Sequence, residues 1–441
     1  MHKGKLIAGH RPFSGLGRTP ERERIAEQCM DVFRRIAEFY RFEKATPAFI
    51  EEAEFFMPLI KAGVLTERHP IGLDLKSDHS FFLRFSGALS LIRAYVTEKM
   101  NDLPHPLRFF YEAPSFSLFA SGSASICEHE EAGLLMIGEE GSVAEAEIVL
   151  ALWKALAEIV NGPDLELVIN ATGCGQCRAQ FRPALSAYLR SRAGRLCKTC
   201  KGNIRTAPTR IFLCTEEKCM SVATHAPQIL DYICDSCKRH LKGFLEFLDE
   251  IEIPYFLDTK LFREGEWFNL LIFEIVARAQ AEVQEEKKGD SWSDGGRILL
   301  GEGGRLSHAG ELLVGKKLDV VSGVLFLEAI ETYLVRVGPK NRVSDEPNVF
   351  LAQLGEFAKR KSLRMLETLR LHGIETRESL GRDSIKSQLK VAETLGVSIT
   401  LILGQKEALD ETIIIREMES GIQEVVPQEK LIEFLKRKLK K

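Results

Sequence analysis

The 441-residue chain lacks several features that would assign it to a class at once. It has no uninterrupted apolar run of about 18 residues, the length that a membrane-spanning helix needs, and no apolar segment typical of a signal peptide after Met1–Lys5. We therefore expect a cytoplasmic protein without a membrane partner. It also lacks an excess of basic charge, because its formal net charge is −3. Any surface that binds nucleic acid must then be a local patch.

Cysteine is scarce outside the segment from Cys174 to Cys237. Only Cys29 and Cys127 lie elsewhere, as lone thiols. The other eight cysteines form four close pairs: Cys174/Cys177, Cys197/Cys200, Cys214/Cys219 and Cys234/Cys237. Two thiolates a few residues apart can bind one metal ion, and a second such pair completes a tetrahedral four-cysteine site. Clustered cysteines in the cytosol are more often metal ligands than disulfides.

This spacing predicts structural zinc, with room for two four-cysteine sites. Disulfides or unpaired core thiols are the alternative. The spacing leaves open all three ways of combining the four pairs into two sites. His225 and His240 lie nearby but outside the repeating spacing, which favours closed structural sites over a catalytic metal centre.

Hydrophobic periodicity before residue 338 predicts an α+β core with an antiparallel sheet. The expected helices cover 20–40, 52–64, 87–100, 142–160, 178–195 and 238–249. The expected strands cover 42–50, 79–85, 106–116, 129–137, 165–169, 254–262, 267–276 and 298–300. Arg210–Leu213 is expected to be extended, Gly301–Arg305 to be a glycine-rich turn and 281–296 to be a hairpin tip or loop. Residues 318–334 read as a strand that leads into a buried helix.

The order of expected helices and strands changes after 338–347, a polar segment with two prolines that reads as a linker. Strands are expected at 349–354, 374–378, 398–403 and 411–416, and helices at 356–372, 383–395 and 428–440. This alternation predicts a separate α/β domain over residues 348–441.

Two parts of the chain resemble the histidyl-tRNA synthetase family. Lys386–Lys390, Ile402–Gly404 and Thr412–Arg416 with Gly421 resemble the family's anticodon-binding domain. The cysteine segment resembles its insertion, at Leu196–Cys200, Arg210–Cys214 and Asp231–Cys234. The resemblance covers nearly the whole chain from about residue 10.

The resemblance implies a class II synthetase with a six-stranded antiparallel catalytic sheet, a homodimer, and histidine activation with ATP and magnesium. The expected division is a core over 1–170 and 251–337, a zinc-binding insertion over 171–250, a linker over 338–347 and an anticodon-binding-like domain over 348–441.

The chain departs from the family at the motifs that bind ATP. The family's F-R-x-E motif reads Phe116–Phe119 here, with Ser117 in place of the arginine, and its G-L-E-R motif reads Phe326–Ala329, with Ala329 in place of the arginine. The family's histidine-binding L-R-P-E-G-T reads Leu83–Ala88. Losing one such electrostatic donor commonly costs about 3–4 kcal/mol of transition-state stabilisation. The sequence therefore predicts that the core does not activate histidine.

The resemblance and the residue types also suggest site residues. The expected substrate or ATP pocket contains Arg84, Arg108, Glu131, Arg263 and Arg305; in an active enzyme Arg263 and Arg108 would be catalytic. For Arg263 a plain surface or salt-bridged arginine is an equal alternative. Phosphate contacts to RNA are expected from Arg377, Arg382, Lys386 and Lys390, against the alternative of a solvated charged face.

The main prediction is a catalytically inactive histidyl-tRNA synthetase-like protein that binds tRNA, with histidine tRNA as the first candidate, or that acts as a regulatory dimer. One alternative is an active histidine–tRNA ligase with unusual ATP contacts, which would need ATP and magnesium. Another is a regulatory subunit of ATP phosphoribosyltransferase in histidine biosynthesis. It ranks third because such relatives usually lack the C-terminal domain that this chain has.

Overall fold

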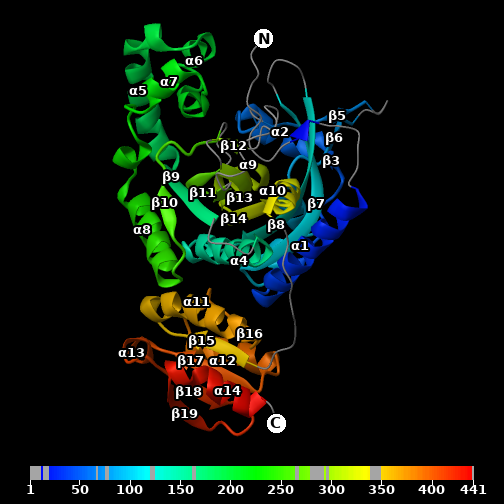
Figure 1. Cartoon of the computed structure of the whole chain (residues 1–441), viewed down its shortest axis with the longest axis vertical. Helices are drawn as coiled ribbons and strands as arrows, with labels where there is room; N and C mark the ends of the chain where they lie inside the picture. Colours follow the sequence, from blue (N-terminus) through cyan, green and yellow to red (C-terminus); the bar gives the residue numbers. More distant parts are fainter. Residues whose placement is uncertain are drawn as a thin grey trace.

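The computed structural model describes residues 11–12, 19–65, 68–74, 79–119, 125–160, 165–263, 268–278, 293–294, 297–337 and 349–439. Two sheets dominate this part of the chain, one in the core and one in the C-terminal domain, which lies at the lower end of the molecule in Figure 1. The predicted linker at 338–347 falls outside the described residues, as does most of the predicted loop at 281–296. No helix in the described part is long and apolar enough to cross a membrane.

An antiparallel ladder forms the centre of the core sheet. Its strands lie in the order β9, β11, β13, β14, β8, β7, and each pairs antiparallel with the next. Their bounds are Leu165–Gly173, Asn269–Arg278, Arg297–Arg305, Val320–Phe326, Ser125–Ile137 and Leu107–Phe119. Short strands extend the sheet: β10 (Tyr255–Leu257), β2 (Glu43–Lys44), β1 (Arg11–Pro12), β4 (Arg68–His69) and β12 (Ser293–Asp294). The predicted α+β core with an antiparallel sheet is confirmed.

Helices cover both faces of this sheet. On one face α4 (Val143–Val160) packs against β14, with α1 (Pro20–Phe39) and α10 (Leu327–Val337) beside it. Helix α1 begins where the Thr19 hydroxyl accepts a hydrogen bond from the Arg22 amide and Pro20 opens the first turn. On the other side a second apolar cluster joins α2 (Ala53–Lys61), α3 (Gly87–Thr97) and α9 (Ser307–Val314). A small sheet of β3 (Ile50–Glu52), β6 (Phe81–Leu83) and β5 (Gly72–Leu73) lies beside them.

The predicted glycine turn at Gly301–Arg305 is wrong, because these residues continue β13 and pair with β14. Glycine serves close strand packing here instead of chain reversal. A Cβ atom on Gly303 would lie 2.3 Å from the Phe273 ring and 2.7 Å from the Cα of Gly323. Gly303 and Gly323 face each other across the two strands. A side chain on Gly303 would displace the neighbouring strand, and a Cβ on Gly323 would lie 2.6 Å from the Leu152 side chain and 2.8 Å from that of Ile148, both on α4.

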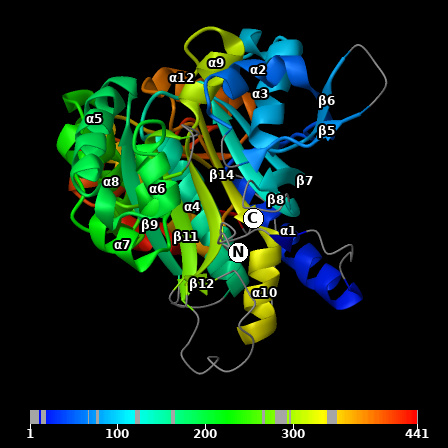
Figure 2. The ribbon, with the colours of Figure 1, turned by 90° about the horizontal axis from the view of Figure 1, so that it is seen from above.

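Residues 174–250 are helical throughout their regular elements: α5 (Gly175–Ser191), α6 (Lys198–Gly202), α7 (Glu217–Ala223) and α8 (Asp235–Glu250), with short 3₁₀ turns between them. Arg210–Leu213 was predicted to be extended, and this is wrong. It lies in a 3₁₀ turn, Pro208–Leu213, that Pro208 opens with its fixed φ. In Figure 1, α5, α6 and α7 stand at the opposite end of the molecule from the C-terminal domain, and Figure 2 shows α5–α8 on one flank of the core sheet.

The C-terminal domain has a mixed sheet in the order β16, β15, β17, β18, β19. Its strands are Thr376–Glu378, Val349–Gln353, Ile399–Leu403, Thr412–Glu417 and Gln423–Pro427, and its helices are α11 (Glu356–Leu371), α12 (Ile385–Thr394), α13 (Gln405–Leu409) and α14 (Leu431–Leu439). The predicted α/β class is confirmed; β19 and α13 were not predicted.

Helix α11 holds this domain against α8 and the short segment after it through ion pairs. Arg360 reaches Glu246 at 2.7 Å, Lys361 reaches Glu250 at 3.1 Å, and Arg364 reaches Glu252 at 2.9 Å.

Candidate functional site

The four cysteine pairs combine in nested order. Cys174, Cys177, Cys234 and Cys237 come together as the outer cysteine group, and Cys197, Cys200, Cys214 and Cys219 as the inner cysteine group. Within each group the sulfur atoms all lie within 4.8 Å of one another. The first pair therefore combines with the fourth and the second with the third, which is one of the three arrangements that the spacing allowed.

The distances between sulfur atoms fit a shared metal ion. In the outer group, Sγ of Cys177 lies 3.5 Å from that of Cys174 and 3.7 Å from that of Cys237, which lies 3.6 Å from that of Cys234. Metal–sulfur bonds of about 2.3 Å in a tetrahedron place the sulfurs about 3.8 Å apart. A disulfide needs about 2.05 Å, and all eight of these cysteines are free. Both groups could hold a metal ion.

Burial raises the pKa of the Cys177 and Cys219 thiols, and hydrogen bonds from backbone amides partly offset this effect. The amide of Cys234 donates to Sγ of Cys177 at 3.2 Å, and the amide of Cys197 donates to Sγ of Cys219 at 3.1 Å. Cys234 immediately precedes α8, and a hydrogen bond from the Cys237 amide lowers the pKa of the Cys234 thiol to about 7. Gly173 has φ +65°, and a Cβ there would lie 2.7 Å from the Cβ of Cys177. The chain thus enters the outer group through a position that requires glycine.

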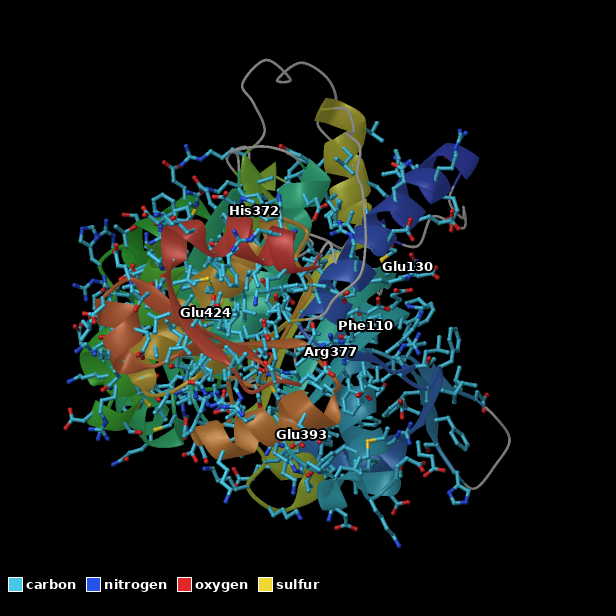
Figure 3. All side chains as sticks on the ribbon, turned by 90° about the horizontal axis from the view of Figure 1, so that it is seen from below. Phe110, Glu130, His372, Arg377, Glu393 and Glu424 are labelled. Atoms are coloured by element: carbon cyan, nitrogen blue, oxygen red, sulfur yellow. The ribbon has the colours of Figure 1, made fainter. Side chains whose placement is uncertain are left out.

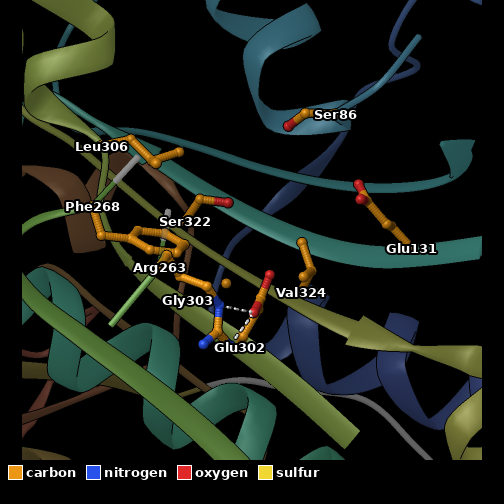
Figure 4. A pocket seen from close by; sticks show the side chains of 10 residues that line it. Ser86, Glu131, Arg263, Phe268, Glu302, Gly303, Leu306, Ser322 and Val324 are labelled. Atoms are coloured by element: carbon orange, nitrogen blue, oxygen red, sulfur yellow. Dashed lines mark hydrogen bonds and ion pairs between the residues drawn. The ribbon is translucent and has the colours of Figure 1, made fainter. Parts of the chain in front are cut away.

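The core sheet carries a separate pocket of about 520 Å³, measured up to its open side, which we call the central pocket. It lies over β8, β13 and β14, with the start of α3 and residue 268 at its rim (Figure 4). Its walls combine polar groups with an apolar surface, as ligand pockets do. The lining residues are Ser86, Glu131, Arg263, Phe268, Glu302, Gly303, Leu306, Ser322, Gly323 and Val324.

Arg263 reaches this pocket with its guanidinium already bound by two carboxylates. Its Nε lies 3.0 Å and its Nη2 2.5 Å from the same oxygen of Glu302, and Nη2 also pairs with Glu274 (Figure 4 shows Arg263 and Glu302). Its side chain is only 12% exposed. Burial alone would lower the pKa of Arg263, but Glu302 and Glu274 raise it above its ordinary value. The charge of Arg263 is therefore balanced within the protein.

Glu131 is held rigidly in the opposite wall. One carboxylate oxygen accepts from the Gly87 amide at 3.2 Å and from the Tyr111 hydroxyl at 3.3 Å, and the other lies 2.9 Å from Nε2 of His129. Burial, followed by the negative charge of Glu131, raises the pKa of Tyr111 well above its ordinary value, so the phenol stays protonated. The carboxylate is thus pre-positioned toward the pocket.

Three of the arginines expected in the pocket do not line it. Arg305 donates to Glu145 at 2.7 and 2.8 Å and to Asp319 at 3.2 Å. Arg84 donates to the backbone carbonyls of Pro47, Ala48 and Pro114, and Arg108 pairs with Glu147 at 3.0 Å and with Glu378 at 3.4 Å. Each guanidinium is engaged in a structural network, which corrects its expected placement. The structure brings together Arg263 and Glu131.

Sequence reasoning missed Glu302 and Ser322. An acidic residue inside the glycine run 301–304 of a buried strand was the signal that could have found Glu302, because nothing else in that strand would explain a charge. The positions that lack the family's arginines, Ser117 and Ala329, are both fully buried. Arg263 is the one basic residue among the described residues that line the pocket.

A neighbouring hollow of about 450 Å³ is lined by basic side chains and by no acidic one among the described residues. It shares Arg263 and Phe268 with the central pocket and adds Arg178 and Arg182 from α5. Phe262 stacks between Phe181 and Phe212, with ring centroids 6.0 and 4.8 Å apart, and so fixes α5 against the core at this point.

The expected RNA-binding residues lie on the C-terminal domain. Lys386 and Lys390 are exposed and one turn apart on α12, Arg382 is exposed just before that helix, and Arg377 is half-buried on β16. Figure 3 looks onto this end of the molecule and labels Arg377 together with Glu393 of α12.

The six-stranded antiparallel ladder with its long β7–β8 hairpin, joined to the C-terminal domain, is the fold of a class II aminoacyl-tRNA synthetase. The family model described as "Anticodon binding domain" matches residues 348–438. The apo histidyl-tRNA synthetase of S. aureus has a similar fold, with a TM-score of 0.57 and 23% identity, covering 96% of this chain and 99% of that one.

Two curated relatives identify the family within this class. The histidine–tRNA ligase of Halothermothrix orenii is 30% identical over 409 residues, covering 92% of this chain and 94% of the relative. That of Caldicellulosiruptor bescii is 28% identical over 425 residues, covering 96% and 97%. The chain belongs to the histidine–tRNA ligase family.

Proposed function

We propose that this chain is a histidyl-tRNA synthetase-like protein that does not activate histidine and that acts by binding tRNA as a homodimer. The observation that carries the proposal is the bound state of Arg263, whose guanidinium faces Glu302 and Glu274 within the central pocket. Activation needs cations that stabilise negative charge as pyrophosphate leaves. A pocket in which the one arginine among the described lining residues is balanced by carboxylates supplies little such stabilisation.

The absence of activation is tested by histidine-dependent pyrophosphate exchange with ATP and magnesium. The histidine–tRNA ligase of Halothermothrix orenii serves as the positive control at equal protein concentration. We expect no exchange above the background measured without histidine. Exchange above that background would overturn the proposal and would instead support an active ligase with unusual ATP contacts.

Binding of tRNA is proposed for the C-terminal domain, with Arg377, Arg382, Lys386 and Lys390 as the phosphate contacts. The match of residues 348–438 to an anticodon-binding domain and the exposure of the two lysines support this assignment. Filter binding of histidine tRNA at increasing salt is the test. Because phosphate contacts release counterions, we expect affinity to fall steeply with salt. Absence of salt-sensitive binding would refute it.

We also propose that zinc occupies both cysteine groups, since four thiolates in a closed tetrahedral arrangement suit Zn²⁺. The proposed domain division is a core over 1–170 and 251–337, a zinc-binding insertion over 171–250, a linker over 338–347 and a tRNA-binding domain over 348–441. In this division the insertion and the C-terminal domain retain function although the core does not activate an amino acid.

A further inference from the structure

Arg382 differs from the two exposed lysines of the proposed RNA surface in the element that carries it. Lys386 and Lys390 lie on α12, which packs on the domain's sheet through an apolar cluster that joins Ala392 to Phe350 of β15. Arg382 is exposed in the loop between β16 and α12. A loop has few hydrogen bonds of its own, so RNA that binds Arg382 must order the loop unless other groups already hold it.

Two buried glutamine amides hold the backbone of this loop. Gln353, the last residue of β15, donates from Nε2 to the carbonyl of Leu380 at 3.4 Å and to that of Arg382 at 3.0 Å. Gln388 of α12 donates from Nε2 to the same Arg382 carbonyl at 2.8 Å and to the backbone carbonyl of Gln353 at 2.7 Å. The carbonyl of Arg382 therefore accepts from both side chains.

The loop is held from the side of the core as well. One carboxylate oxygen of Glu378, at the end of β16, accepts from the Leu380 amide, and the other lies 3.4 Å from Nη2 of Arg108 on β7. The next residue also lies close to the core, because a Cβ on Gly381 would be 3.1 Å from Oε2 of Glu139. The backbone around Arg382 is thus fixed in the protein without RNA.

Stability of the domain does not account for the two glutamines. A buried side-chain amide is unfavourable unless all of its polar groups find partners. Oε1 of Gln353 is buried and has no hydrogen-bond partner among the described residues. Methionine would fill nearly the same volume without an unsatisfied oxygen. What the amide of Gln353 does provide is two hydrogen bonds to the loop.

From these contacts we infer that Gln353 and Gln388 are positioning residues for RNA binding. They fix the backbone that carries Arg382, so that its side chain meets a phosphate without the entropic cost of ordering the loop. Neither glutamine contacts RNA itself, because both side chains are buried. The inference rests on the proposed function, since it concerns how the same RNA surface is formed.

Gln353→Met tests the inference in the full-length, metal-loaded protein, because it removes the two hydrogen bonds to the loop and leaves the backbone groups of residue 353 in place. We expect the affinity for histidine tRNA in filter binding to fall about 3- to 10-fold. Gln388→Met, which removes the second donor to Arg382, should act in the same direction. Gln428→Met is the matched control: Gln428 donates from Nε2 to the Thr412 carbonyl at 3.0 Å, away from the loop, and its loss should change affinity less than about 2-fold.

Variants of two neighbouring basic residues separate positioning from a general structural loss. In the Arg382→Ala background, Gln353→Met should change affinity less than about 2-fold, because the contact that it positions is gone. In the Lys386→Ala background it should keep its full effect. The inference is overturned if Gln353→Met alone leaves affinity unchanged, if its effect is the same in both backgrounds, or if Gln428→Met weakens binding equally.

Hydrogen exchange of the unsubstituted protein supplies a test that needs no variant. The Arg382 amide donates to the Ser379 carbonyl at 3.0 Å, so it should exchange slowly without RNA, and histidine tRNA should slow it little further. An Arg382 amide that exchanges freely until tRNA is added would overturn the inference. If the unsubstituted protein shows no salt-sensitive tRNA binding, the proposed function is refuted and the inference falls with it. Binding without the expected coupling to Arg382 refutes the inference alone.

Discussion

Replacing one ligand in each cysteine group should have unequal effects. We predict that Cys237→Ser, in the outer group, costs more stability than Cys200→Ser, in the inner group. The outer group joins Cys177 to Cys234, which are 57 residues apart, whereas the inner group joins Cys197 to Cys214, which are 17 residues apart. A metal that ties two distant points restricts the unfolded chain more when the loop is longer.

The magnitude follows from the entropy of closing each loop. Treated as single cross-links, the 57-residue and 17-residue separations correspond to about 4 and about 3 kcal/mol respectively. The outer variant should therefore lose about 1 kcal/mol more. It should also expose α5–α7 to protease, because the outer group lies where the chain enters and leaves these helices.

Metal content and limited proteolysis measure these effects together. Elemental analysis should find two ions per chain in the parent protein and one in either variant, and trypsin should cut between 178 and 232 faster in Cys237→Ser than in Cys200→Ser. Cys29→Ala, which removes a buried thiol of α1 outside both groups, is the control and should keep both ions. The reasoning is refuted if the parent protein contains no metal, or if the metal-free protein resists trypsin as well as the loaded one.

Three further predictions concern the buried charges and the RNA surface. Arg305→Leu should lower the free energy of unfolding in urea by about 3–5 kcal/mol, because it leaves Glu145 buried without its guanidinium. Burial raises the pKa of Glu147 to about 8, so the folded state keeps a proton that the unfolded chain releases. Stability should then fall as pH rises from about 5 to 8, and Glu147→Gln should flatten this slope. Lys386→Ala and Lys390→Ala should each reduce the slope of log affinity for tRNA against log salt by about 1.

Local pattern predicted most of the elements, because each depends on a periodicity that the chain itself carries. Helix α1 and the β7–β8 hairpin are examples: apolar spacing and a central turn segment are visible without any partner. The prediction that Arg210–Leu213 is extended was wrong because a few apolar residues after a proline suit a 3₁₀ turn as well as a strand. The prediction of a turn at Gly301–Arg305 was wrong because a glycine needed for close strand packing looks the same in sequence as one needed for a turn.

The site residues also divide into those that the sequence could identify and those whose placement depends on the fold. The eight ligating cysteines could be named from spacing, but their nested combination depends on where β9 and α8 meet in the fold. The sequence alone could not tell which arginines lie at the pocket, because the position of each one depends on a carboxylate from a distant strand or helix. Glu302 and Glu274 hold Arg263 at the pocket, whereas Glu145, 160 residues away in sequence, holds Arg305 outside it.

The nested order of the cysteine groups also bears on chain connectivity. A single cut anywhere from residue 201 to 213 would leave Cys174, Cys177, Cys197 and Cys200 on one fragment and the other four ligands on the second. Each ion would then bridge the two fragments, with two ligands from either side. Sequential pairing would have left each ion on one fragment alone. The two pieces of a chain opened here should therefore reassociate when metal is supplied and separate when it is chelated, which makes this segment a natural position for a metal-controlled split protein.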